Sequence, residues 1–501
     1  MTKSWVKSGP GRLVSGGAWF LGLMTLSGVF WLILGIQISR TYGPQGFGLF
    51  STASSVFDFM WAFIFGGFFE GLIHFGTTHL TQKDANIAKF FSKYVRYLTI
   101  MSLVVFAVFS LLSLNVSSNI QRIFILSLAF AFLFVGTKDA LSSLLGSLHK
   151  SRELSSINSV GFYVITIVGL IFVLLNLPSE LLPVLITFGP ICQMMLCLYF
   201  TRSYIKDLIS YNYDFFAKRK IKHALLEDLR EYKKILFFGF SVSIGKISFM
   251  VMKNLDIPFL GLFYNLSNVG VYSVADTASS VLFSMTAFAL PIISSISEAW
   301  AKKDWDEIQK CVAISVKLPL VLGLALTMII FVLAEPIVRE IFGPAFVGAV
   351  VPLQILIIGT FLLMFGYTLS SILIGIGKPK LSGTLMAVAA MQYIVSIFIL
   401  VPLFGLNGAA VSLTLTGVTS LVLIPLYIRR NLKIEVFSGL WKVLISGTVL
   451  GVLLMVIPKF DFFVVLLGTA GSCVVYSLLL YYMGYITVQD IKTLKTATPQ
   501  Q

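Results

Sequence analysis

Eight ionisable side chains lie inside long apolar segments of this 501-residue chain. On insertion scales a charged residue at the centre of a membrane helix costs roughly 2.5–3.5 kcal/mol, so such residues usually face a partner or a polar cavity. They are Asp58, Glu70, Lys138, Asp139, Lys246, Lys253, Asp256 and Asp276. The lysines have the chemistry to bind phosphate, and the carboxylates have the chemistry to carry a coupling proton or sodium ion.

Two of the lysines share one apolar segment, 235–263. At the rise of an α-helix, Lys246 lies about 17 Å into this segment, near the middle of a bilayer. Lys253 follows seven residues later and therefore lies on the same helical face. We expect Lys246 and Lys253 to line a cavity and bind an anionic group, with Lys138 as the third candidate.

The alternative role for these lysines is structural. Lys253 could pair with Asp256 at a spacing of three residues, and Lys246 could pair with Asp276 in the next segment. Lys138 and Asp139 are adjacent, so their side chains are not expected to share a helical face. The sequence leaves both roles open.

The carboxylates and two arginines are further candidates. Asp58, Asp276 and Asp256 are candidate coupling or cavity carboxylates, because buried carboxylates can take up a proton near neutral pH. A carboxylate that is simply hydrogen-bonded in the helix interior is the alternative. Arg40 and Arg339 each precede a Gly-Pro pair and could form an outer gate, although a plain turn with an interfacial arginine is the simpler interpretation.

Membrane helices must position these residues. The chain has fourteen apolar stretches, and 57% of its residues are hydrophobic. About 20 helical residues cross a bilayer core of about 30 Å. The stretches are 17–39, 47–74 and 235–263, with others beginning near Tyr94, Arg122, Ser155, Glu180, Val269, Ala313, Phe346, Leu381, Leu406, Leu440 and Phe462. No alternation of period two is present, so the sequence predicts an all-α polytopic membrane protein with fourteen transmembrane helices.

Lysine and arginine alternate between the gaps that separate the stretches. Thirty of the 37 lie in gaps on one side, and cytoplasmic loops are the ones enriched in these residues. Both termini should therefore be cytoplasmic. Membrane topology accounts for most of the net charge of +15, so the charge does not indicate nucleic-acid binding.

Neither a metal site nor an enzyme active site is evident in the sequence. The four cysteines and four histidines have no CxxC, HxH or HExxH spacing, so we expect no metal and no cofactor. A membrane-embedded glycosyltransferase commonly builds its active site from a large outer loop with acidic residues. The outward gaps here are short, so we expect a protein that is not an enzyme.

Two short segments recur at nearly one offset. Gly48–Ala53 matches Gly270–Ala275 at an offset of 222 residues, and Lys150–Ser155 matches Lys378–Ser382 at 228. Six stretches separate the copies, so both should have the same orientation, related by an axis along the membrane normal. This predicts a six-helix lobe at 1–202, a cytoplasmic linker at 203–234, a second six-helix lobe at 235–430, and two extra helices with a tail at 431–501.

Several segments carry a resemblance to a known family. They are Ile38–Phe50, Asp256–Ala275, Ile341–Gly343, Gly375–Ser382 and Val401–Ala410. In order and spacing they resemble the polysaccharide-biosynthesis (lipid-linked oligosaccharide) flippases of the multidrug, oligosaccharidyl-lipid and polysaccharide exporter superfamily. The resemblance implies two pseudosymmetric lobes forming a V and a central cavity. It also implies alternating access that moves a lipid-linked oligosaccharide, by its polyprenyl pyrophosphate, across the cell membrane.

The resemblance also implies partners and leaves alternatives. Membrane lipids and a polysaccharide polymerase or assembly proteins are the implied partners. A multidrug or toxin exporter of the same superfamily typically has twelve spans. A peptidoglycan-precursor exporter usually has basic residues in spans 1 and 2 that are missing here. A membrane-embedded glycosyltransferase or polymerase remains the alternative from a different class.

Overall fold

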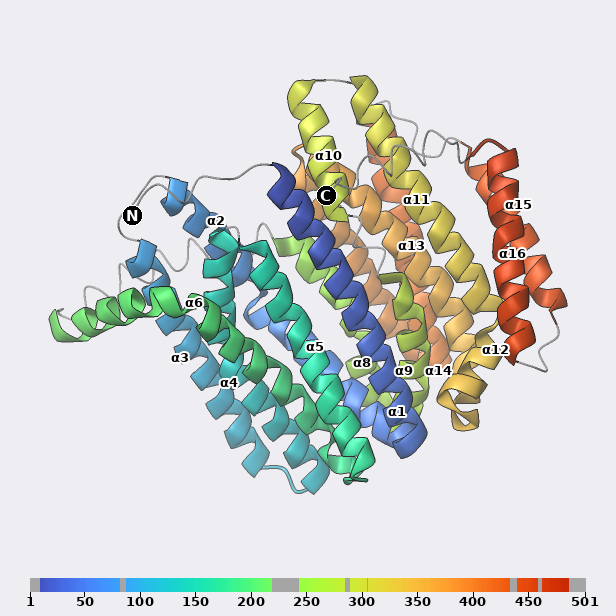
Figure 1. The fold of residues 1–501 in the computed structure, drawn as a ribbon. Helices are drawn as coiled ribbons and strands as arrows, with labels where there is room; N and C mark the ends of the chain where they lie inside the picture. Colours follow the sequence, from blue (N-terminus) through green and yellow to red (C-terminus); the bar gives the residue numbers. More distant parts are fainter. Residues whose placement is uncertain are drawn as a thin grey trace. The chain divides into compact units, whose positions relative to one another are not determined.

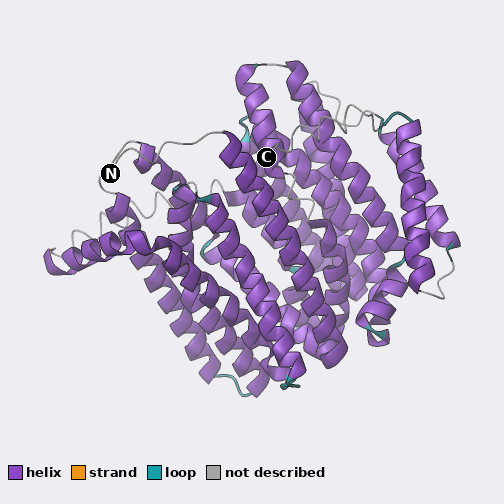
Figure 2. Cartoon of the chain, viewed as in Figure 1, coloured by secondary structure: helices purple, strands orange, loops and turns teal. Residues whose placement is uncertain are grey.

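The computed structural model describes residues 10–81, 87–148, 150–218, 243–283, 289–303, 305–432, 439–457 and 462–485. Within these ranges the regular structure is helical and no strand occurs (Figures 1 and 2). This confirms the predicted all-α class.

The described helices form two compact units. The first, Trp19–Gly270, is the N-terminal unit, and the second is the C-terminal unit, formed by the described residues from Val271 onward together with those before Trp19. The N-terminal unit contains α1 (Pro10–Ile64), α2 (Gly66–Thr81), α3 (Ile87–Leu114), α4 (Asn119–Ser147), α5 (Ser151–Leu174), η1 (Ser179–Val184), α6 (Leu185–Lys218), a helical segment at 243–254, α8 (Asp256–Phe263) and the start of α9 (Leu266–Ser279).

The C-terminal unit continues α9. Its further elements are α10 (Ala289–Lys302), α11 (Trp305–Val332), α12 (Ala334–Pro336), η3 (Ile337–Phe342), η4 (Pro344–Ala349), α13 (Val350–Gly375), α14 (Pro379–Leu432), α15 (Leu440–Val456) and α16 (Phe462–Tyr482). Along the sequence, the boundary between the two units falls within α9, whereas the boundary between the predicted lobes is the linker 203–234. The units are defined by helices that touch, and the lobes were defined by a sequence repeat. The lobe boundaries and the V therefore stay predictions.

The helices are built to cross a membrane. Within the described residues, eight are long and apolar enough to do so, or nine when the bent pair Pro319–Val332 and Ala334–Phe342 counts as one span. Two of the eight, Leu26–Ile64 and Pro379–Ile428, are 39 and 50 residues long. Each long helix contains two helices that meet at a glycine with positive φ, Gly43 (65°) or Gly405 (60°). The chain is therefore a multi-pass membrane protein, and the count of fourteen stays a prediction.

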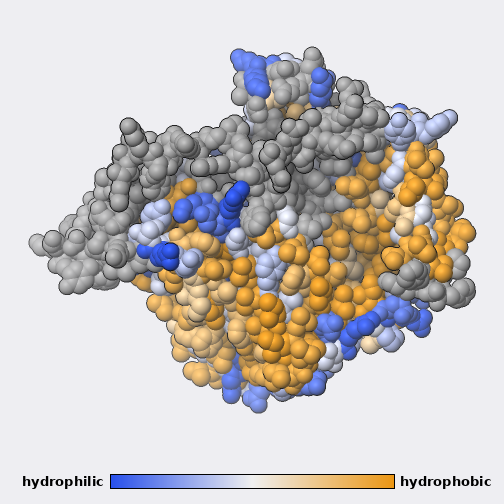
Figure 3. Space-filling model, viewed as in Figure 1, coloured by the Kyte–Doolittle hydropathy of each residue, from blue (hydrophilic) through white to orange (hydrophobic). Residues whose placement is uncertain are grey.

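Apolar side chains cover the flanks of these helices. On the visible face of the N-terminal unit they cover α3 to α6, with hydrophilic residues gathered at the helix ends (Figure 3). In α3 only 17% of the most apolar 18-residue stretch is buried, and Val104 and Leu111 are exposed. Such a surface is unfavourable in water and suits contact with lipid chains.

The glycines that open the two sequence repeats touch each other. A Cβ on Gly48 would overlap the carbonyl oxygen of Leu266, and a Cβ on Gly270 would overlap the carbonyl oxygen of Pro44. Each contacted carbonyl lies four residues before the partner glycine, so the contact is symmetric. Glycine lets two helix backbones approach this closely. The contact therefore supports the duplication predicted from the sequence.

A second symmetric feature marks the other repeated segment. The Lys150 ammonium lies 5.7 Å from the ring centroid of Tyr204 in α6. In the second copy, the Lys378 ammonium lies 5.6 Å from the ring centroid of Tyr427 in α14. Each unit thus ties the loop before a helical hairpin to the end of that hairpin by a cation–π contact.

The glycine contact predicts a stability difference between two substitutions. We expect Gly270→Ala to destabilise the fold by about 1–3 kcal/mol, because the added methyl group must push α9 away from α1. Gly261→Ala in α8 is the matched control, since its Cβ would lie 3.9 Å from the Thr52 methyl carbon, an ordinary contact. The thermal midpoint of the detergent-purified protein measures both, and equal midpoints would refute the close packing.

Candidate functional site

Six polar residues of the N-terminal unit form what we call the charged cluster. Three elements contribute two residues each: the part of α1 after Gly43, α4, and the helical segment 243–254. The residues are Asp58 and Trp61, Lys138 and Asp139, and Lys246 and Lys253. Five of them are charged residues singled out in the sequence.

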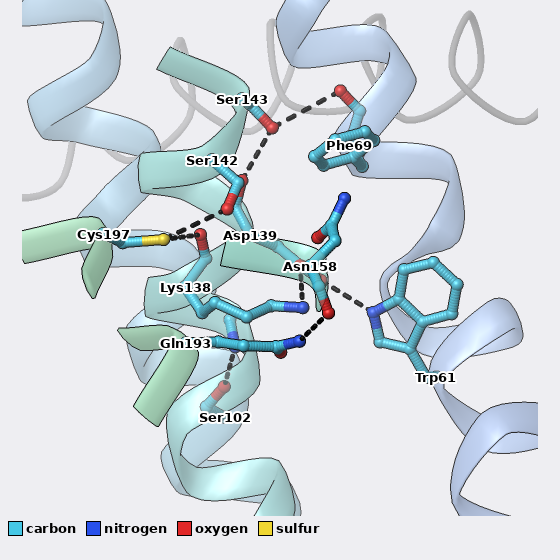
Figure 4. Close-up of polar contacts among 11 residues, drawn as sticks. Trp61, Phe69, Ser102, Lys138, Asp139, Ser142, Ser143, Asn158, Gln193 and Cys197 are labelled. Atoms are coloured by element: carbon cyan, nitrogen blue, oxygen red, sulfur yellow. Dashed lines mark hydrogen bonds and ion pairs between the residues drawn. The ribbon is translucent and has the colours of Figure 1, made fainter. Parts of the chain in front are cut away.

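The Asp139 carboxylate contacts both Lys138 and Trp61. Its Oδ1 lies 2.8 Å from the Lys138 ammonium, and its Oδ2 accepts a 2.8 Å hydrogen bond from the Trp61 indole N–H. Figure 4 shows the carboxylate between these two donors. The Lys138 side chain is 13% exposed and that of Asp139 is 3% exposed. Both carboxylate oxygens are therefore engaged in a nearly buried ion pair.

Aromatic rings hold the second lysine. The Lys246 ammonium lies 5.7 Å from the Trp61 ring centroid and 5.2 Å from that of Phe69 in α2. The Lys138 ammonium lies 5.9 Å from the same Trp61 ring. A cation over an aromatic face gains electrostatic attraction without being neutralised. Trp61 thus gathers two positive charges from different helices at one ring.

The remaining members act through longer-range charge. Lys253 and Lys138 lie close enough for their positive charges to act on the Asp58 carboxylate. Asp58 is exposed, and Lys246 and Lys253 are half-buried. These three side chains are therefore less enclosed than the Asp139 carboxylate, which is 3% exposed.

Side-chain hydrogen bonds to the α4 backbone set the position of Lys138 and Asp139. The Gly136 N–H donates to Ser102 Oγ of α3 at 2.9 Å, and the Cys197 thiol of α6 contacts the Lys138 carbonyl oxygen at 3.8 Å. A Cβ on Gly136 would overlap the Leu98 carbonyl oxygen, so glycine is what lets α3 approach α4 here. Figure 4 shows these contacts around Lys138.

Serines of α4 lie against the backbone of α2, which carries Phe69. Ser143 Oγ donates to the Asp139 carbonyl oxygen at 2.7 Å and lies 3.4 Å from the Phe69 carbonyl oxygen of α2. One turn later, Ser147 Oγ donates to the Ser143 carbonyl oxygen at 2.8 Å and lies 3.3 Å from the Ile73 carbonyl oxygen of α2. Small hydroxyl residues let membrane helices pack closely and bond across the interface. They fix α2 against α4, and with it the Phe69 ring near Lys246.

The other predicted site residues lie outside the charged cluster. Asp256 is 1% exposed, and its Oδ1 accepts a hydrogen bond from the Ile257 N–H at 2.9 Å, as at a helix start. Asp276 lies half-buried in α9, within the C-terminal unit. The side chain of Glu70 lies outside the described residues. The proposed Lys246–Asp276 and Lys253–Asp256 pairs stay predictions.

Both arginines predicted at an outer gate flank backbone turns. Arg40 is exposed in α1 and precedes the break at Gly43. Arg339 is also exposed, with its Nη1 3.8 Å from Glu335 Oε1, and precedes Gly343 (φ 117°). These are the turns that the simpler interpretation expected, and the gate stays a prediction.

Lys138 and Asp139 form the 2.8 Å ion pair although the Cβ positions of adjacent residues do not share a helical face. A lysine stem with four methylene groups can bend back to its neighbour, which helical periodicity of the Cβ positions does not take into account. Sequence reasoning also missed Trp61 and Phe69. An aromatic residue in an apolar span is usually interpreted as part of the hydrophobic core. The one available signal was that Trp61 follows Asp58 by three residues, a spacing that puts the two side chains on one helical face.

The Lys138–Asp139 ion pair has no counterpart in the second copy of the repeat. At the offset of 228 residues, Lys138 and Asp139 correspond to Gly366 and Tyr367. A Cβ on Gly366 would lie 2.8 Å from the Ser420 Cβ of α14, so the second copy is tightly packed where the first carries its ion pair. The ion pair therefore belongs to the first copy of the repeat, whereas Lys246 and Lys253 of the charged cluster lie in the segment 235–430 predicted as the second copy.

The sequence of this chain matches two protein families. The chain matches the family described as polysaccharide biosynthesis protein over residues 13–298, and the MatE family over residues 242–399. It is 26% identical over 183 residues to the probable low-salt glycan biosynthesis flippase Agl15 of Haloferax volcanii. It is also 30% identical over 205 residues to an uncharacterised membrane protein of Methanocaldococcus jannaschii. These matches cover 36% and 39% of this chain and span only 39% and 38% of the relatives.

Solved structures share the fold at low sequence identity. The lipid II flippase MurJ in an inward closed conformation has a TM-score of 0.71 at 16% identity, covering 93% of this chain and 99% of that one. An inward-facing multidrug resistance transporter of the MATE family has a TM-score of 0.62 at 16% identity, covering 81% and 96%. The family match covers more than half of the sequence. The chain therefore belongs to the polysaccharide biosynthesis protein family, within the multidrug, oligosaccharidyl-lipid and polysaccharide exporter superfamily.

Proposed function

We propose that this protein is a flippase. It moves a polyprenyl-pyrophosphate-linked oligosaccharide or polysaccharide repeat unit from the cytoplasmic to the outer leaflet by alternating access. Family membership supports the transporter class over a membrane-embedded glycosyltransferase or polymerase. The relative Agl15, named as a probable glycan biosynthesis flippase, supports a lipid-linked glycan as the substrate class.

One observation carries the substrate proposal. The Lys246 ammonium lies on the Trp61 and Phe69 rings, beside a second lysine on Trp61. A lysine presents a compact charge that suits phosphate, and the aromatic rings restrain the position of its ammonium group. Lys246 and Lys253 bind the pyrophosphate, with Lys138 as the third cation, while the sugar follows an aqueous path.

The charge of the cluster also separates the proposal from its alternatives. Its three lysines and two carboxylates favour an anionic ligand over the cationic and neutral compounds of a multidrug exporter. The fourteen spans predicted from the sequence exceed the twelve typical of that class, and α15 and α16 lie in the region predicted to hold the two extra helices. A peptidoglycan precursor shares the pyrophosphate chemistry, so it is an outcome that the assay must distinguish.

The remaining parts of the proposal concern location and energy. The protein lies in the cell membrane with both termini cytoplasmic, and the enrichment of lysine and arginine in the gaps on one side supports this orientation. Asp58 carries the coupling proton or sodium ion, with Asp276 and Asp256 as further candidates, because a carboxylate inside a membrane span can take up a proton near neutral pH. A polysaccharide polymerase or assembly proteins receive the flipped product.

Reconstitution in liposomes tests the function. A fluorescent polyprenyl-pyrophosphate oligosaccharide is placed in one leaflet, and its accessibility from the other leaflet is followed over time. We expect flipping that depends on the protein and accelerates under a proton or sodium gradient. Lipid II and a fluorescent cationic drug are the comparison substrates. The proposal fails if the oligosaccharide lipid is not moved, or if the drug is moved and the lipid is not.

A further inference from the structure

Trp61 contacts three charged residues of the charged cluster. Its indole N–H donates to Asp139, and its ring lies near the ammonium groups of Lys138 and Lys246. These partners come from α4 and from the segment 243–254, whereas Trp61 itself belongs to α1. A single side chain thereby connects three helices of the N-terminal unit.

The N–H and the ring of Trp61 serve different partners. The N–H holds the Asp139 carboxylate, whose other oxygen pairs with Lys138, so the indole fixes that lysine indirectly. The ring holds Lys246 together with Phe69, and contacts Lys138 as well. Two long, flexible lysine chains are thus restrained around one rigid plane, which reduces the ordering that a bound anion would otherwise have to impose.

We propose that Trp61 is the positioning residue of the anion site, and that it holds the Lys138 and Lys246 ammonium groups at one ring as a pair of cations for a pyrophosphate. The inference rests on the proposed function and deepens it. Trp61 acts through the lysines and does not itself bind phosphate. The paired arrangement makes the site prefer pyrophosphate over monophosphate, because each phosphate group meets its own ammonium.

The ring and the N–H can be separated by substitution. Trp61→Phe keeps an aromatic face for the lysines and removes the hydrogen bond to Asp139. Trp61→Leu removes both. The matched control is Trp31→Phe, which changes another tryptophan of α1 whose ring packs against Phe50 at 5.4 Å and Phe162 at 5.9 Å.

Binding of geranylgeranyl pyrophosphate and geranylgeranyl monophosphate to the full-length protein in detergent tests the inference. We expect Trp61→Leu to weaken pyrophosphate binding about tenfold and monophosphate binding clearly less, since the pair of cations is lost. We expect Trp61→Phe to recover binding to within about threefold of the parent protein. Trp31→Phe should bind both ligands as the parent does.

Fluorescence supplies a second readout that does not need the leucine variant to fold. Pyrophosphate binding should change tryptophan emission in the parent protein and in Trp31→Phe, and most of that change should vanish in Trp61→Phe. The inference is overturned if Trp61→Leu keeps the pyrophosphate preference. It is equally overturned if Trp61→Phe loses as much affinity as Trp61→Leu, or if Trp61 emission does not respond. Failure of the parent protein to bind pyrophosphate at all would instead refute the proposed function.

Discussion

Lys246→Glu is expected to abolish flipping of the pyrophosphate-linked oligosaccharide while leaving membrane insertion intact. The substitution replaces an attraction to the substrate by a repulsion at the same place. Two unit charges 4 Å apart interact by about 4 kcal/mol at an effective dielectric constant of 20, so the reversal exceeds a thousandfold in affinity. The added carboxylate would also face the electron-rich faces of Trp61 and Phe69, which hold the lysine now.

Two further variants show whether the loss comes from the site. Lys246→Arg keeps the positive charge and the ring contacts, so it should retain substantial transport. Lys310→Glu reverses an exposed lysine in the first turns of α11 and should flip as the parent does. The initial flipping rate, divided by the amount of folded protein in the liposomes, is the measurement. Normal flipping by Lys246→Glu would remove this lysine from the mechanism.

The second large effect concerns stability. We expect Asp139→Asn to destabilise the N-terminal unit by about 3–5 kcal/mol, because it leaves the Lys138 charge without its carboxylate in a nearly buried position. The exposed fractions of 13% and 3% are what make the loss large, since an exposed pair would contribute about 1 kcal/mol or less. The amide oxygen of the new side chain can still accept the Trp61 N–H, so the measured loss isolates the charge.

A double variant completes the test. Lys138→Met together with Asp139→Asn removes both charges and keeps similar volumes, so it should recover most of the lost stability. Thermal midpoints and denaturant unfolding are measured for the parent, Lys138→Met, Asp139→Asn and the double variant. These four proteins form a double-mutant cycle that gives the coupling free energy between the two residues. A double variant less stable than Asp139→Asn alone would show that the two residues do not act as a pair.

Hydropathy and charge alternation predicted much of the fold. Long apolar stretches and their lysine-rich gaps fixed the all-α membrane class, because burial of apolar helices in lipid dominates every other term. The repeat was also visible, since Gly48 and Gly270 must both be glycine for two backbones to meet. These features depend on local composition or on one small residue, and a sequence displays both.

The candidate site was only partly predictable. The cost of charge in lipid marked Lys138, Asp139, Lys246 and Asp58 as residues with a purpose. Their partners could not be read from the sequence, because Trp61 and Phe69 look like ordinary apolar residues until α1, α2 and the segment 243–254 are brought together. The Lys138–Asp139 pair shows the same limit, since side-chain length decided a contact that backbone periodicity argued against.

Photo-crosslinking tests most directly whether the charged cluster receives the phosphate groups. A polyprenyl-pyrophosphate oligosaccharide with a photoreactive group beside the pyrophosphate is bound to the detergent-purified protein and irradiated, and the modified peptides are identified by mass spectrometry. We predict labels within 58–69, 138–143 and 243–256, lost on competition with unlabelled pyrophosphate lipid. Labels confined to the C-terminal unit, or insensitive to the competitor, would contradict the account.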